Sequence, residues 1–175
     1  MVGIRNRAGA AGVVTSNLSA LDVQAVALGM IGVDGRGYDL KKGLIETGVD
    51  ISPLIESVEI LTPTYTKPMV RDADGVEREI ERLDIKNRVP LQASIEQSMI
   101  ERLRDLIQDC DGAIIIDHVP ERNFGVISDR VRDEITALSR RYPEKFFLAD
   151  SRKHMGLFKK VIVKCNLSEA LEAAG

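Results

Sequence analysis

The feature that most constrains the fold is an alternation of short apolar runs with amphipathic segments of helical period. Residues 25–33 form a nine-residue apolar run without helical polar spacing, which predicts a buried strand. Further strand-like runs follow at 112–117, 146–150 and 160–164. Strands that alternate with helices imply right-handed crossovers between parallel strands. The sequence therefore predicts an α/β fold with a mainly parallel sheet.

The predicted helices begin and end at residues that suit helix caps. A short helix is predicted over residues 13–21, and Gly48 is placed to end the helix that follows residue 37. Ser94 and Gln97 form a capping-box pattern at the start of the next helix. Ser128 is placed to cap the helix after that. These caps support the division into strand and helix units.

The segment 62–87 departs from this rhythm. Its apolar and charged residues alternate loosely and break at Asp74-Gly75, which is a hairpin signal. Pro63 and Pro68 fit an edge strand and not a central one. The segment therefore predicts a charged hairpin beside the main sheet.

Composition excludes several classes of function. The net charge of −3 gives no electrostatic reason to bind nucleic acid or an anionic membrane. The longest apolar run is too short to span a bilayer. Cys110 and Cys165 lack CxxC or His-ligand spacing, which is typical of free thiols in a reducing cytosol. We expect a cytoplasmic protein that has neither nucleic acid nor membrane as a partner.

Three polar residues fall where strands end. Asp117, Asp150 and Asn166 end or follow apolar strands, and ligands of parallel sheets bind at the carboxyl ends of strands. Such residues also cap local turns and helices, so two interpretations stay open. The same holds for Asn166 and Glu169, which could cap a helix or order Mg²⁺ and phosphate.

Common nucleotide motifs are absent from the sequence. The glycine spacing in the turn 32–37 does not fit a dinucleotide fingerprint, and no GxxxxGK[ST] occurs. His118 and His154 have neither a neighbouring nucleophile pattern nor HExxH spacing. Both histidines are therefore predicted to be structural or surface groups.

The sequence contains a series of motifs over residues 8–172: AGAAGVVTSNLSAL (8–21), LGMIGVDGRG (28–37), GVD (48–50), TYTKPMV with ERLD (64–70 and 81–84), IIID (114–117) and NLSE (166–169). Taken in order, these motifs resemble those of ribokinase-like, PfkB-family sugar kinases. The segment at 62–87 is similar to the lid hairpin of the heptose-phosphate kinase branch of that family.

The resemblance implies a Rossmann-like three-layer αβα core of ribokinase type with a mainly parallel sheet and a small β lid hairpin. It implies phosphoryl transfer from ATP, with Mg²⁺, to a hydroxyl of a sugar or sugar phosphate. The site residues that it implies are Gly9, Gly12, Lys67, Arg82 and Asp117 for the substrate, Asn166 and Glu169 for the nucleotide phosphates, and Glu169 for the metal.

One element of the family is missing from this chain. No GAGD-type segment occurs, so the catalytic base is expected beyond residue 175. We therefore expect residues 1–175 to be a partial kinase domain with a lid inserted at 62–87. The chain would pair with a C-terminal half or form a homodimer through its lid. The alternative is a non-catalytic remnant or half-enzyme that binds a sugar phosphate or a partner chain.

Overall fold

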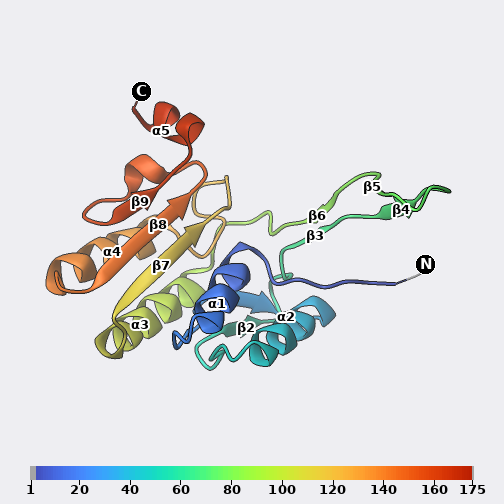
Figure 1. Cartoon of the computed structure of the whole chain (residues 1–175). Helices are drawn as coiled ribbons and strands as arrows, with labels where there is room; N and C mark the ends of the chain where they lie inside the picture. Colours follow the sequence, from blue (N-terminus) through green and yellow to red (C-terminus); the bar gives the residue numbers. More distant parts are fainter. Residues whose placement is uncertain (1–2, 175) are drawn as a thin grey trace.

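A computed structural model describes residues 3–174 of the chain (Figure 1). The described residues form two parallel sheets, six helical segments and a two-stranded ribbon that projects away from the sheets. No helix in residues 3–174 is long and apolar enough to cross a membrane. The mixed α/β architecture with parallel strands confirms the predicted fold class.

The first sheet pairs β1 (Met30–Gly32) with β2 (Ile55–Ser57) in parallel. Helix α1 (Ala10–Ala20) precedes it and α2 (Gly35–Glu46) connects its strands. The predicted strand over 25–33 is thus split, because only 30–32 joins β2 and the earlier part pairs through a single bridge between Val26 and Asp50.

The turn between β1 and α2 is held by one carboxylate. Asp34 accepts hydrogen bonds from the backbone N–H of Gly37 at 2.7 Å and of Thr62 at 2.8 Å. Burial raises the pKa of Asp34, but these backbone hydrogen bonds outweigh it and the pKa lies below its usual value. A Cβ on Gly37 would lie 2.3 Å from the carbonyl oxygen of Gly32, so this turn requires glycine.

The segment 62–87 forms an antiparallel ribbon. At its root, β3 (Thr64–Thr66) pairs with β6 (Leu83–Ile85). At its tip, β4 (Met69–Arg71) pairs with β5 (Glu77–Glu79). All six residues of these two tip strands are exposed. The ribbon lies outside both parallel sheets, as Figure 1 shows.

The second sheet has the order β7-β8-β9 and is parallel throughout. Its strands are β7 (Gly112–Asp117), β8 (Phe146–Ser151) and β9 (Ile162–Lys164). The helices around it are α3 (Ala93–Asp109), α4 (Asp129–Arg141), the 3-10 turn η1 (Met155–Leu157) and α5 (Leu167–Ala174).

Helices α3 and α4 cover one face of this sheet. Ile115 and Ala149 are paired in register and pack with both helices. The buried side chains of this core include Ile95, Met99, Ile100, Ile107, Ile115, Val131, Ile135, Leu138, Phe147 and Ala149.

The opposite face of the same sheet is more open. Side chains alternate between faces along a strand, so Ile114, Leu148 and Ile162 form a row across that face. Ile114 is 38% exposed and Ile162 is 55% exposed. Within the described residues, this sheet therefore has one dry face and one partly solvated apolar face.

Helix ends follow the predictions in part. Ser128 caps α4 by accepting a hydrogen bond from Val131 N–H, and Gly48 adopts a positive φ of 77° after α2. Ser94 does not cap α3, whose N-cap is Gln92 without a side-chain hydrogen bond. Gln97, the expected partner of Ser94, instead accepts a hydrogen bond from Arg130 of α4.

Candidate functional site

The carboxyl end of the second sheet carries two pairs of polar residues. Asp117 of β7 lies in register with Ser151 of β8, and Asp150 of β8 lies in register with Lys164 of β9. Neighbouring residues of a strand point to opposite faces. Asp117 and Asp150 therefore share one edge of the sheet but lie on opposite faces.

The first pair belongs to a buried cluster on the α4 side. Asp117 accepts a hydrogen bond from the Ser151 hydroxyl at 3.0 Å. The guanidinium of Arg132 lies 3.7 Å from Asp117, and Nδ1 of His154 lies 3.5 Å from it. Because a buried charge needs a partner, Arg132 and Asp117 stabilise each other inside the fold.

Arg132 also connects this cluster to the surface of α4. Its guanidinium donates to Asp129 at 2.7 Å and to the carbonyl of Ile127 at 3.1 Å, and it lies 5.4 Å from the centre of the Phe158 ring. Two nitrogens of the cluster, Nε of Arg132 and Nδ1 of His154, are buried and have no hydrogen-bond partner. The cluster is therefore a buried polar group in which these two nitrogens could still form hydrogen bonds.

The second pair lies nearer to solvent. Asp150 is 3.2 Å from Nζ of Lys164 and 3.6 Å from Nε2 of His118. A carboxylate between an ammonium and an imidazole is held in place by charge, and His118 gains positive charge only if it is protonated. The predicted structural role of the two histidines stays a prediction, although each lies beside an aspartate.

Asn166 and Glu169 form a reciprocal capping box at the start of α5. Glu169 N–H donates to Oδ1 of Asn166 at 2.9 Å, and Asn166 N–H donates to Oε2 of Glu169 at 2.8 Å. The local interpretation of this motif is therefore present in the structure. Within residues 3–174, Oε1 of Glu169 makes no hydrogen bond, so one carboxylate oxygen stays available to a ligand.

The two predicted substrate cations of the ribbon are paired locally. Nζ of Lys67 lies 2.8 Å from Glu79. Arg82 makes two hydrogen bonds to Asp84, at 2.7 and 2.9 Å, and lies over the ring of Tyr65 at 4.8 Å. The structure does not bring either cation into contact with Asp117 or Asn166.

The two predicted glycines differ in their surroundings. Gly9 is the N-cap of α1, and a Cβ there would meet nothing within 4 Å. A Cβ on Gly12 would lie 2.2 Å from Cβ of Ala8 and 3.5 Å from Leu44. Gly12 is therefore required by packing, whereas Gly9 leaves its backbone open to a neighbouring molecule.

Sequence reasoning missed Arg132, Ser151 and Lys164. Arg132 stands next to Val131 in the apolar pattern of α4 and is 3% exposed. An arginine beside the apolar stripe of a helix is buried only with a carboxylate partner. The position of Arg132 in this pattern could therefore have indicated a buried ion pair. Lys164 ends β9 and Asp150 is the penultimate residue of β8, but their pairing depends on the register.

The described residues hold no cluster of three or more His, Cys, Asp or Glu side chains that could hold a metal. Mg²⁺ is usually held by one or two carboxylates together with phosphate oxygens and water. The single free carboxylate oxygen of Glu169 is compatible with such a shell. The residues present therefore fit Mg²⁺ that arrives with a phosphate, and not a metal cage made by the protein alone.

Comparison with known proteins gives both sequence relatives and fold relatives. The bifunctional protein HldE of Helicobacter hepaticus is 33% identical over 113 residues, which is 65% of this chain and 22% of that protein. HldE of Wolinella succinogenes is 26% identical over 163 residues, which is 93% of this chain and 32% of that protein. The chain thus spans between about a fifth and a third of these curated relatives. No family model matches the chain.

Solved structures with a similar fold include sugar kinases. The apo structure of an E. coli ribokinase II has a TM-score of 0.62 at 15% identity and covers 87% of this chain and 46% of that one. The structure of E. coli ribokinase II with ATP and Mg²⁺ has a TM-score of 0.60 at 16% identity, with the same coverage. The sequence relatives and the fold relatives together support a resemblance to PfkB-type, ribokinase-like carbohydrate kinases near the heptose kinase branch.

Proposed function

We propose that this chain is part of an ATP-dependent kinase that phosphorylates a hydroxyl group of a sugar or sugar phosphate. The observation that carries the proposal is the ribokinase-like fold together with a charged ribbon fastened at the carboxyl end of a parallel strand. Gly32, the last residue of β1, donates a backbone hydrogen bond to the hydroxyl of Thr62 at the ribbon root. Ligands of parallel sheets bind at that end.

In this proposal residues 62–87 act as a lid over the sugar. Lys67 and Arg82 would bind an anionic group of the substrate, and each would exchange its present carboxylate partner for a phosphate oxygen. The open backbone at Gly9 suits close approach of a sugar hydroxyl. Asp117 would contribute through the buried cluster with Arg132, on the sheet face that carries α4.

The nucleotide phosphates would lie near the start of α5. Asn166 and Glu169 would order the phosphates of ATP, and Glu169 would hold Mg²⁺ through Oε1. When bound, Mg²⁺ neutralises the charge that phosphoryl transfer spreads over the phosphate oxygens. The capping box fixes the Glu169 side chain before any ligand binds, which reduces the entropy lost on binding.

The remaining machinery would come from further polypeptide. The sequence contains no GAGD-type segment to supply a catalytic base, and the chain spans less than a third of the HldE relatives. The open row of Ile114, Leu148 and Ile162 is suited to cover by a C-terminal half. We place such an enzyme in the cytoplasm, where ATP is available. A homodimer that forms through the lid is the second arrangement that we propose.

The test is a coupled ATP assay over hexoses, heptoses and heptose phosphates. The chain is assayed alone and then with the C-terminal part of the kinase domain of Helicobacter hepaticus HldE as a separate polypeptide. We expect no turnover from the chain alone and turnover from the mixture. Turnover by the isolated chain would show that the base has been misplaced. Sugar binding by the mixture without any turnover would support the non-catalytic alternative.

Two substitutions at Glu169 separate capping from metal binding. Glu169→Gln keeps a side chain that can accept the Asn166 N–H, but it removes the charge. We expect Glu169→Gln to lower turnover of the mixture by roughly 10²–10³-fold without lowering the melting temperature. Ser168→Ala, in the same turn, is the control and should have no effect. Full activity in Glu169→Gln would show that this residue only caps α5.

A further inference from the structure

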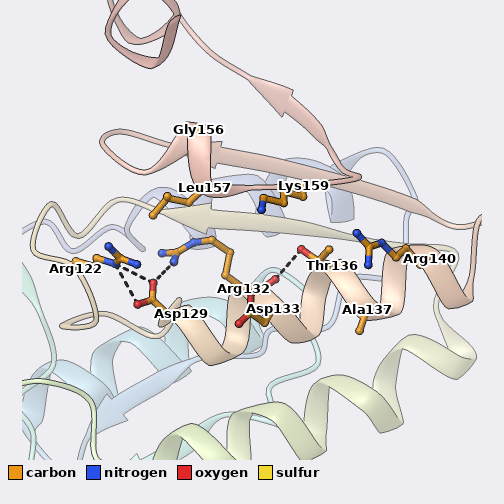
Figure 2. A pocket seen from close by; sticks show the side chains of 10 residues that line it. All are labelled: Arg122, Asp129, Arg132, Asp133, Thr136, Ala137, Arg140, Gly156, Leu157 and Lys159. Atoms are coloured by element: carbon orange, nitrogen blue, oxygen red, sulfur yellow. Dashed lines mark hydrogen bonds and ion pairs between the residues drawn. The ribbon is translucent and has the colours of Figure 1, made fainter. Parts of the chain in front are cut away.

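A cleft of about 810 Å³ lies between α4 and the segment that joins β8 to β9 (Figure 2). Arg132, Thr136 and Arg140 line it from one face of α4, at intervals of four residues. Leu157 and Lys159 line it from the opposite side. Of the residues that line the cleft, Arg132 alone takes part in the proposed kinase roles, through its contact with Asp117.

The charges of the cleft are unbalanced. Arg122, Arg132, Arg140 and Lys159 line it together with only two carboxylates, Asp129 and Asp133. The excess is two positive charges, in a chain whose net charge is −3. Hydrogen bonds from Arg122, Asn123 and Arg132 hold the pKa of Asp129 at about 2, so this carboxylate is ionised at neutral pH.

The two cations at the far end of the cleft have no partner. Arg122 and Arg132 both bind Asp129, at 3.0 and 2.7 Å. Arg140 and Lys159, in contrast, make no hydrogen bond or ion pair with any residue from 3 to 174, and both are exposed. Two cations that face one cleft repel each other unless an anion lies between them. This end of the cleft is therefore suited to an anionic group.

The rest of the cleft combines polar and charged side chains with a small apolar surface, which suits a polar organic body. Ala137 and Leu157 supply apolar surface, and Leu157 is 39% exposed. Arg132 is 3% exposed, and its Nε has no hydrogen-bond partner. Arg132 and Arg140 are eight residues apart on α4, which corresponds to about 12 Å along the helix. A molecule the size of a sugar phosphate or a mononucleotide spans that length.

We propose that this cleft binds a phosphorylated small molecule, with its phosphate between Arg140 and Lys159 and its organic body against Leu157, toward Arg132. Helix α4 runs from the carboxyl end of the sheet back to the amino end, so Arg140 in its last turn lies away from the proposed kinase site. The ligand is thus a regulator and not the substrate. Its effect would reach the kinase site through Arg132, which contacts Asp117.

The test is titration of the full chain, without ATP or a partner half, followed by backbone NMR. The probes are inorganic phosphate, ribose 5-phosphate, ribose and a short acidic peptide. We expect ribose 5-phosphate to bind more tightly than phosphate, and ribose not to bind. The amide shifts should fall in α4 and in residues 155–159. Because no turnover is measured, the result does not depend on the proposed function.

Matched variants locate the site. Arg140→Gln and Lys159→Gln should each weaken ribose 5-phosphate binding by about tenfold, as expected for the loss of one charge-assisted hydrogen bond. Arg141→Gln is the control, because Arg141 is in the same helical turn but lies over the Tyr142 ring and does not line the cleft. Arg78→Gln, in the ribbon, should also leave this binding unchanged, because Arg78 is paired with Asp72 and does not line the cleft.

Four results would overturn the proposal. The first is no saturable binding of ribose 5-phosphate, and the second is binding that moves amides of the ribbon or α5 and responds to Lys67→Gln. Equal affinity for phosphate and ribose 5-phosphate would reduce the site to one for inorganic anions. Binding of an acidic peptide in preference to both probes would make the cleft a protein interface.

Discussion

The sheet of β7, β8 and β9 and the ribbon of β3 to β6 are stabilised in different ways. In the sheet, Ile115, Phe147 and Ala149 lie under α3 and α4 and are at most 6% exposed. In the ribbon, every residue of β4 and β5 is exposed, and the strands are joined by antiparallel backbone pairing and by ion pairs such as Lys67–Glu79. Burial of apolar side chains therefore stabilises the sheet, whereas the ribbon depends on backbone hydrogen bonds and screened charge.

The largest effect is expected from the core. Ile135 is 2% exposed between α4 and the sheet, so Ile135→Ala should lower the free energy of unfolding by about 2–5 kcal/mol. Ile80→Ala, in the ribbon where Ile80 is 66% exposed, should cost less than about 0.5 kcal/mol. Urea denaturation measures both. Equal losses of unfolding free energy in the two variants would show that the sheet and the ribbon do not differ in this way.

The next effect concerns Lys145, which binds the carbonyl oxygens at the carboxyl end of α3. Nζ of Lys145 donates to the carbonyl oxygens of Ile107, Gln108 and Cys110, at 2.7, 2.8 and 2.7 Å. Lys145→Met should cost about 1–3 kcal/mol, because it leaves partly buried carbonyls without a donor. Lys42→Met is the control, since Lys42 makes only an exposed ion pair with Glu46. Thermal unfolding gives the comparison, and similar stability of both variants would contradict it.

The third effect depends on pH. Arg122, the first of several hydrogen-bond donors, lowers the pKa of Asp129 from 3.8 to about 2. Because the folded pKa is the lower one, its stabilisation is present above pH 3.8 and is lost as pH falls toward 2. After solvent screening, the effect is on the order of 1 kcal/mol, because Asp129 and Arg122 are 38% and 60% exposed.

Asp129→Asn provides the measurement. The difference in unfolding free energy between Asp129→Asn and the parent should be largest near neutral pH and should shrink toward pH 2. Asp105→Asn, at an exposed position of α3, should show no such trend. A difference that stays constant over this range would mean that the carboxylate acts only as a neutral acceptor.

The smallest effect is expected in the ribbon. A double-mutant cycle of Lys67→Gln and Glu79→Gln should give a coupling energy of about 0.2–1 kcal/mol. The coupling should weaken with added salt, because the pair is exposed. Amide hydrogen exchange in β4 and β5 reports it locally. A coupling that is insensitive to salt would mean that the ribbon is more protected than its exposure indicates.

Local sequence patterns predicted the helix ends well where the structure depends only on residues that are close in sequence. Ser128 caps α4 and Gly48 follows α2 because each depends only on the adjacent turn. Ser94 is not a cap because α3 begins before it, at Ala93, and the Gln97 side chain accepts a hydrogen bond from Arg130 of α4, which is distant in sequence. The apolar run 25–33 predicted a strand but not its break, which depends on a partner segment that turns at Pro53.

The candidate site was harder to predict for the same reason. Asp117 and Asp150 could be placed at one edge from their positions in the strands. Their opposite faces and their partners depend on the pairing register and on the packing of α4, which no local pattern contains. Arg132 therefore emerged only from the structure, whereas the spacing of Asn166 and Glu169 is local and could be recognised.

The root of the ribbon has a mechanical consequence. The amide of Asn87 binds both the N–H and the carbonyl of Leu61, each at 3.0 Å, and so imitates one rung of an antiparallel pair. Thr62 is fixed to Gly32 and to Asp34, the cap of α2. These hydrogen bonds fix residues 61 and 62, so bending of the ribbon is confined to the residues that lie farther out. A force on the ribbon tip is therefore transmitted through Thr62 and Asp34 to the first turn of α2.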